Sequence, residues 1–325
     1  MTLTEEHAVN PVSAARLGRA NKAFFSLTMF AAILVLAIFV GMFVALFDGA
    51  WPALHKFGFD FFTTQVWNPV KERYGILAPI GGTLITSAIA MAIAVPVGIG
   101  IAIFLTELCP PVLRRPIGIA VELLAGVPSI IYGIWGLFVF APLFQGTLQP
   151  WIIDLAEPIP VLNVLFAGPP FGIGMFTASL ILAVMILPLV ASITRDVFET
   201  VPPVLKEASY GLGSTVREVV QNVVLPYARA GVVGGAMLAL GRALGETMAV
   251  TFVIGNAHKL APSLFAPGTT ISAAIANEFS EATTPLYVSS LLAAGFFLFI
   301  ITFIVLMAAQ LMLAQLDRKA GGKKL

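Results

Sequence analysis

Two residues of opposite charge, Arg242 and Glu246, stand in an otherwise apolar stretch at about 229–254. A charge inside a bilayer is costly, so both side chains are expected to face protein or a water-filled path. The arginine guanidinium is a planar fork of donors that suits a phosphate-like oxyanion and stays protonated when desolvated. The four-residue spacing predicts a shared helix face, on which Glu246 would hold the fork or compete with the anion for it. A structural ion pair remains the alternative.

The composition of the chain requires lipid as part of its solvent. Of 325 residues, 58% are hydrophobic and 11% are charged, against roughly 25% charged in soluble domains. A bilayer core needs about 20 apolar residues per helix. Runs of this kind predict an all-α integral membrane protein with six transmembrane helices, at about 24–47, 76–106, 117–144, 172–194, 229–254 and 288–315.

Lysine and arginine are distributed unevenly between the loops. With a cytoplasmic N-terminus, 13 of them fall in inside segments and only four, Lys56, Lys71, Arg73 and Lys259, in outside loops. An excess of positive charge marks cytoplasmic loops, so both termini are predicted to be cytoplasmic. The predicted organisation is a tail at 1–22, a first helix and outer loop at 23–75, a core at 76–315 and a basic tail at 316–325.

The longest polar interruption, 195–229, lies on the predicted cytoplasmic side. Pro202 and Pro203 can open a helix, Gly211 and Gly213 can end it, and Ser214 or Thr215 can cap a second helix. Valines recur in that second helix at the spacing of one face, at Val216, Val219, Val220 and Val223. The segment therefore predicts a compact two-helix projection that a partner groove could hold.

The same segment resembles the EAA loop of bacterial ABC-importer permeases, which we place at 200–228. The match preserves the spacing of the motif over 20 positions, with Ser for the second Ala and Val for Ile, at Glu207, Ala208, Ser209, Gly213, Val223, Leu225 and Pro226. The resemblance implies a type I ABC-importer permease fold. It also implies that the loop sits in a cleft of a separate ATPase and that Glu207 contacts this ATPase.

Two further phrases, GRALGETMAV and FDFFTTQVWNPV, resemble the PstC-type permeases of the phosphate-specific ABC importer. The resemblance covers most of 57–315. It implies inward passage of inorganic phosphate by alternating access, in the bacterial inner membrane and in contact with lipid. It implies a heterodimer with a PstA-type permease, a PstB-type ATPase dimer and a PstS-type periplasmic phosphate-binding protein. It also links the positions of Arg242 and Glu246 to phosphate passage.

Other readings of the residues stay open. An arginine fork does not separate phosphate from sulfate or molybdate, and an ATP-independent anion carrier or channel would need no EAA loop. The chain has no phosphate-binding loop of the Gly-x-x-x-x-Gly-Lys-Ser/Thr type, so ATP hydrolysis is expected on another subunit. No catalytic set, metal cluster or cofactor motif occurs, and the net charge of +1 argues against nucleic acid. We therefore predict a transport subunit and not an enzyme.

Overall fold

The computed structural model describes residues 11–321, which form two compact units divided between Gly49 and Ala50. The expected tails at 1–22 and 316–325 lie partly outside this range. The described elements of the chain before the fourth span are α1 (Pro11–Phe57), α2 (Asp60–Thr63), β1 (Trp67–Asn68), β2 (Arg73–Tyr74), α3 (Leu77–Ile103), the π-helix η1 (Phe104–Leu108), α4 (Pro111–Ala125), α5 (Ser129–Trp135), the π-helix η2 (Gly136–Phe140), α6 (Ala141–Gly146), α7 (Leu148–Ala156) and α8 (Pro160–Leu165).

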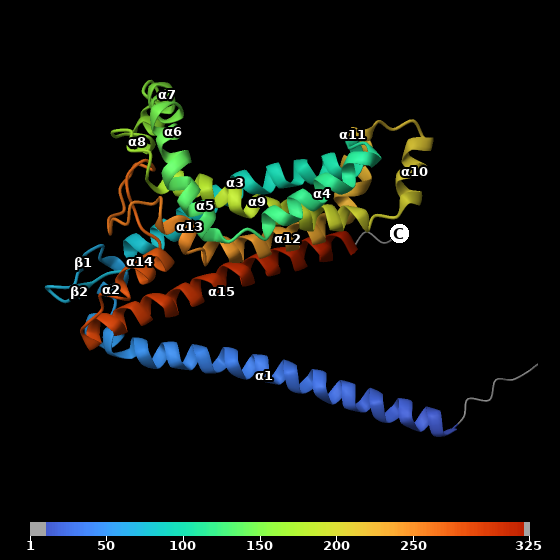
Figure 1. Cartoon of the computed structure of the whole chain (residues 1–325), viewed down its shortest axis with the longest axis horizontal. Helices are drawn as coiled ribbons and strands as arrows, with labels where there is room; N and C mark the ends of the chain where they lie inside the picture. Colours follow the sequence, from blue (N-terminus) through green and yellow to red (C-terminus); the bar gives the residue numbers. More distant parts are fainter. Residues whose placement is uncertain (1–10, 322–325) are drawn as a thin grey trace, which may run out of the picture. The chain divides into compact units, whose positions relative to one another are not determined.

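The remaining elements of the described chain are α9 (Met175–Glu199), α10 (Pro203–Gly211), α11 (Val216–Val219), the π-helix η3 (Val220–Val224), α12 (Leu225–Leu244), α13 (Met248–Thr251), α14 (Ile271–Glu278) and α15 (Pro285–Gly321). The helix α15 thus runs through residues 316–321 (Figure 1). Helix α1 begins at Pro11 and passes from the first unit into the second.

Within residues 11–321, six helical segments are long and apolar enough to cross a membrane, which confirms the predicted number of spans. They are Asn21–Phe57, Leu77–Leu108, Ser129–Gly146, Met175–Glu199, Val216–Leu244 and Pro285–Met312. The first unit presents its apolar side chains outward: Phe24 is 66% exposed and Val35 is 68% exposed. Such a surface is stable in lipid and not in water.

The third span begins later than the sequence predicts. We expected the apolar run over 117–144 to contain breakers at Gly126 and Pro128 and to kink or begin as a short interfacial piece, and in the structure α4 ends at Ala125 and the span begins at Ser129. The break is caused by Pro128, which has an extended backbone, lacks an N–H donor and disfavours a helical residue before it. Helix α4 is therefore a separate element, linked to α5 by the Tyr132 hydroxyl, which donates to the Leu124 carbonyl at 2.9 Å.

The core of the second unit is built where α3, α9 and the α12–α13 segment meet. Buried side chains from these helices form one cluster that includes Ala94, Ile181, Leu182, Ile186 and Val250. Helices α3 and α9 approach closely at Gly98, where an added Cβ atom would lie 2.7 Å from a methyl of Val190. Small residues at a crossing allow membrane helices to gain van der Waals contact, so this pair forms the rigid centre of the unit.

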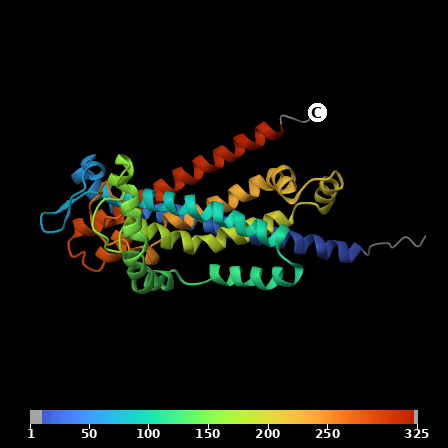
Figure 2. The same ribbon diagram turned by 90° about the horizontal axis from the view of Figure 1, so that it is seen from above.

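The two ends of the second unit carry different structures. Figures 1 and 2 show α10 and α11 at one end, and the β1–β2 hairpin, α2 and α6 to α8 at the other. We call them the α10–α11 end and the hairpin end. A second buried cluster, with Phe198, Val219, Val224 and Val232 among its members, fixes the α10–α11 end to α9 and α12.

Candidate functional site

Arg242 lies in the last turn of α12, three residues before the helix is capped at Gly245. A cation in this position interacts favourably with the negative end of the helix dipole. The side chain is exposed in the single chain. Its charge acts electrostatically on Tyr132 of α5, so Arg242 lies close to the start of the third span.

Glu246 does not share a helix face with Arg242, so that prediction was wrong. Helix α12 ends at Leu244, and Glu246 stands in the three-residue break before α13. Its carboxylate accepts a hydrogen bond from the Ala249 amide at 3.2 Å and so caps α13. Among residues 11–321, no ion pair joins Arg242 to Glu246.

The break between α12 and α13 is held by packing against α5. An added Cβ atom at Gly133 would lie 2.7 Å from the ring of Phe252 and 2.9 Å from the Met248 carbonyl oxygen. The glycine therefore lets α5 cross directly over α13. Near the break the backbone bonds are long, at 3.4 Å both for Gly245 to Gly241 and for Glu246 to Ala243. Interruptions of a span persist where neighbouring helices support them, as α5 does here.

One face of α12 is left uncovered by the rest of the chain. Leu238 and Arg242 are both exposed, and their four-residue spacing places them one above the other on the same side of the helix. Arg242 is the charged member of this pair. A charge facing lipid is costly, so this side of α12 requires either a protein partner or water.

The segment at the α10–α11 end forms the predicted first short helix and turn, but the second helix is not short: we expected it to end near Leu225–Pro226, and it continues from Val216 through η3 into α12. Helix α10 covers Pro203–Gly211, and Gly213 follows with a φ of +87°, a conformation that favours glycine. Thr215 caps the next helix and forms a capping box with Glu218. The turn is closed by a bond of 3.0 Å between the hydroxyls of Ser209 and Ser214.

The seven predicted loop residues fall into two groups. Glu207 and Ala208 are exposed on α10, and Ser209 is half-buried beside the Gly213 turn. Val223, Leu225 and Pro226 lie instead where η3 joins α12, and the first two pack against the buried cluster of the α10–α11 end. The exposed helix α10 is thus followed by the Gly213 turn and then by a buried segment where η3 joins α12. Apolar side chains of this loop also point outward, with Val204 70% exposed and Leu212 89% exposed.

Sequence reasoning missed a buried ion pair at this end. Lys206 of α10 lies 2.6 Å from Glu107 of η1, and their side chains are only 19% and 6% exposed. Burial raises the pKa of the nearby Tyr210 hydroxyl, and the negative charge of Glu107 raises it further. The pair joins residues 99 positions apart, and no local spacing in the sequence signals it.

The architecture defines a multi-pass membrane transport subunit: six apolar spans, with a two-helix projection between the fourth and the fifth. Residues 94–320 match the family described as "Binding-protein-dependent transport system inner membrane component", and the chain belongs to this family.

Two relatives extend the likeness over nearly the whole chain. A "Phosphate transport system permease protein PstC" of Mesorhizobium japonicum is 63% identical over 306 residues, which are 94% of each chain. A protein of the same name from Pasteurella multocida is 55% identical over 300 residues, which are 92% of this chain and 93% of that one.

Solved structures of ABC importers share the fold. The crystal structure of a bacterial alginate ABC transporter, with a periplasmic protein bound to an alginate pentasaccharide, has a chain that matches with a TM-score of 0.55 and 16% identity. The match covers 90% of this chain and 96% of that one. A second alginate-importer structure gives 0.53, with coverage of 92% and 99%. At this identity the likeness shows the fold alone, and it confirms the predicted type I ABC-importer permease fold.

Proposed function

We propose that this chain is one of two permease subunits of an ATP-driven importer that carries inorganic phosphate into the cytoplasm of a bacterium. The observation that carries the proposal is the 63% identity to a phosphate transport permease over 94% of both chains. An exposed arginine within a membrane span supports it, because a guanidinium fork suits a tetrahedral oxyanion. Import of sulfate or molybdate is the alternative, and a competition experiment separates these substrates from phosphate.

The side of α12 that carries Leu238 and Arg242 would face the second, PstA-type permease and the path between the two subunits. The arginine attracts the anion into a region where lipid offers no solvation, and the attraction must be weak enough for release. Glu246 would affect the path indirectly. Its carboxylate accepts a hydrogen bond from the Ala249 amide of α13 and so stabilises the interruption between α12 and α13. Alternating access would then move Arg242 relative to α5 and α13.

The loop at 200–228 is the contact with a PstB-type ATPase dimer in this account. Its exposed side chains, Glu207 and the apolar Val204 and Leu212, are suited to a partly apolar groove with a polar rim. The α10–α11 end therefore faces the cytoplasm, as the distribution of Lys and Arg predicts. The hairpin end then faces outward, toward a PstS-type binding protein.

The substrate is tested by competition. The assembled complex, purified through a tag on this chain and placed in liposomes with internal ATP, is supplied with binding protein and labelled phosphate. We expect uptake that unlabelled phosphate suppresses and that excess sulfate or molybdate leaves unchanged. Suppression by sulfate or molybdate at equal concentration would replace phosphate by that oxyanion and keep the architecture.

A further inference from the structure

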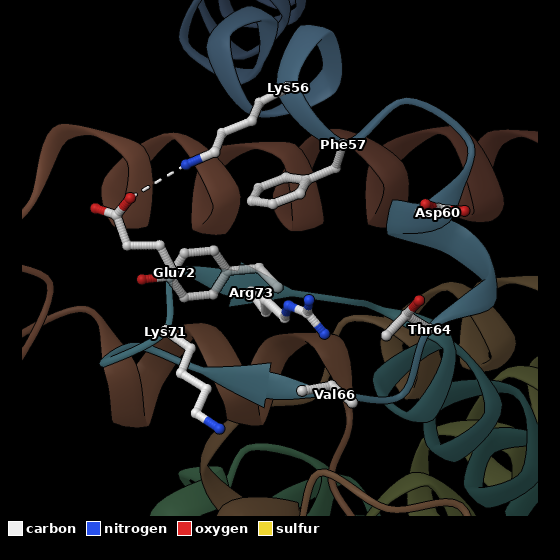
Figure 3. A pocket seen from close by; sticks show the side chains of 9 residues that line it. Lys56, Phe57, Asp60, Thr64, Val66, Lys71, Glu72 and Arg73 are labelled. Atoms are coloured by element: carbon white, nitrogen blue, oxygen red, sulfur yellow. Dashed lines mark hydrogen bonds and ion pairs between the residues drawn. The ribbon is translucent and has the colours of Figure 1, made fainter.

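The hairpin end contains a hollow of about 470 Å³, bounded by the end of α1, α2 and the β1–β2 hairpin (Figure 3). Its polar lining consists of Lys56, Asp60, Thr64, Lys71, Glu72 and Arg73. Three of these six side chains are cationic. They are three of the four Lys or Arg residues that the charge pattern places outside the membrane.

The hairpin that carries these cations is fixed from behind. Trp67 pairs with Tyr74 across the two strands. The Trp67 ring stacks on His258 at 5.1 Å, and the Tyr74 ring stacks on Tyr287 at 5.1 Å. Successive side chains of a strand point to opposite faces, so the burial of Tyr74 turns Arg73 outward. The hairpin is thus a rigid support that presents Arg73 to the hollow.

The cations of the hollow differ in their partners. Lys56 pairs with Glu72 at 3.1 Å. Glu72 lies in the turn between β1 and β2 and has a positive φ of 47°. Neither Lys71 nor Arg73 has a carboxylate partner within residues 11–321. Figure 3 shows the Arg73 guanidinium directed toward Thr64 and the Lys71 ammonium directed away from the Lys56–Glu72 pair.

Another segment of this end has the opposite charge. The segment 145–171, which contains α7 and α8, has no Lys or Arg, and it exposes Asp154 and Glu157. Three of the four Lys and Arg residues of this end therefore line the hollow, beside Asp60 and Glu72, and the fourth is Lys259. A local charge of this kind steers and orients a partner of opposite sign.

We propose that Lys71 and Arg73, held at the rim of this hollow, form a docking contact for an acidic surface of the soluble binding protein. The inference rests on the proposed function, which makes the hairpin end the outer face. The family itself is described as binding-protein-dependent. The hollow is open and much larger than one tetrahedral oxyanion. Its size favours a protruding carboxylate-bearing side chain over free phosphate.

The test measures docking separately from transport. The complete importer in nanodiscs is titrated with its phosphate-loaded binding protein at low and at physiological salt, and the dissociation constant is recorded. Lys71→Glu combined with Arg73→Glu should weaken binding roughly tenfold at low salt and less at high salt. The milder Arg73→Gln should give a smaller loss in the same direction. The matched control is Lys259→Glu, which reverses an exposed charge at the same end but outside the hollow.

Unchanged affinity in the Lys71/Arg73 variant, or an equal loss in the Lys259 control, would overturn the proposal. A second arm titrates the nanodiscs with inorganic phosphate alone. Phosphate binding that depends on Arg73 would also overturn it, because the hollow would then be an anion site. Failure of phosphate transport with docking intact and sensitive to Arg73 would count against the proposed substrate and leave the docking contact standing.

Discussion

Lys206 Nζ lies 2.6 Å from Glu107 Oε1 and so ties the helix that precedes the Gly213 turn to the end of the second span. Glu107 belongs to η1, which continues α3, and α3 forms the rigid centre of the unit with α9. A displacement of α10 by a bound ATPase would therefore reach the core through this pair. The contact is direct, and mutation can exchange its two charges.

Breaking the Glu107–Lys206 pair should both destabilise and uncouple the importer. Lys206→Ala leaves a carboxylate that is 6% exposed without its cation. We expect a loss of roughly 2–3 kcal/mol, somewhat below that of a fully buried pair because Lys206 retains some exposure. Thermal unfolding and the ratio of phosphate moved to ATP hydrolysed are the measurements. The exchange Glu107→Lys with Lys206→Glu should recover part of both, and no recovery would remove the pair from the coupling route.

The turn at Gly213 should be required for coupling and dispensable for membrane insertion. Its φ of +87° is inaccessible to proline and costs other residues about 1–3 kcal/mol. Gly213→Pro should therefore abolish ATP-driven uptake while the protein stays in the membrane, and Gly213→Ala should reduce it partially. Membrane fractionation and uptake are measured together. Normal ATP-driven transport in Gly213→Pro would contradict the role of this turn.

The exposed helix α10 should contact the ATPase through Glu207. Glu207→Lys reverses a charge without removing any ion pair or side-chain hydrogen bond within the described chain, so thermal unfolding of the subunit should change little. We expect weaker copurification of the ATPase, by severalfold, and loss of coupled uptake. Arg114→Glu, at an exposed position of α4 outside this loop, serves as the comparison. Equal copurification in Glu207→Lys and the unmodified protein would place the contact elsewhere.

The hairpin end should lose stability as the pH falls. Burial lowers the pKa of His258, against an opposing effect of Glu278. A folded pKa below the usual value means that the unfolded chain binds more protons, so this contribution is complete above about pH 6.5 and declines as the pH falls below it. Trp67 stacks on the ring, so its fluorescence between pH 8 and pH 5 reports the change. His258→Asn should flatten this dependence, and an unaltered profile would exclude His258 as its source.

The sequence allows the number of spans and the two-helix projection to be predicted, because apolar length and local helix signals determine them. Pro202, Gly213 and Thr215 act through their own backbone and the next few residues, and they lie where the pattern places them. The break before the third span also follows from a local signal, Pro128, whereas the end of the fifth span was not predictable in this way. The break before Met248 depends on α5 crossing at Gly133, and that is a tertiary contact.

The candidate site likewise combines features that the sequence predicts with features that depend on tertiary packing. Arg242 is recognisable because a charge in an apolar stretch is rare. Its separation from Glu246 is not recognisable, since a four-residue spacing predicts proximity only if the helix continues. The Glu107–Lys206 pair depends on residues 99 positions apart, and the anchoring of the hairpin depends on His258 and Tyr287 from distant segments. Such features follow from packing and become visible only in the folded chain.

The central claim, ATP-driven phosphate import through this subunit, is tested most directly by labelled phosphate uptake into liposomes that contain the assembled complex. Uptake is measured with and without internal ATP, with and without the binding protein, and with Arg242→Gln in place of the unmodified chain. We expect uptake that requires both ATP and the binding protein and that falls at least about tenfold in Arg242→Gln, with the complex still assembled. Uptake that proceeds without ATP would contradict it.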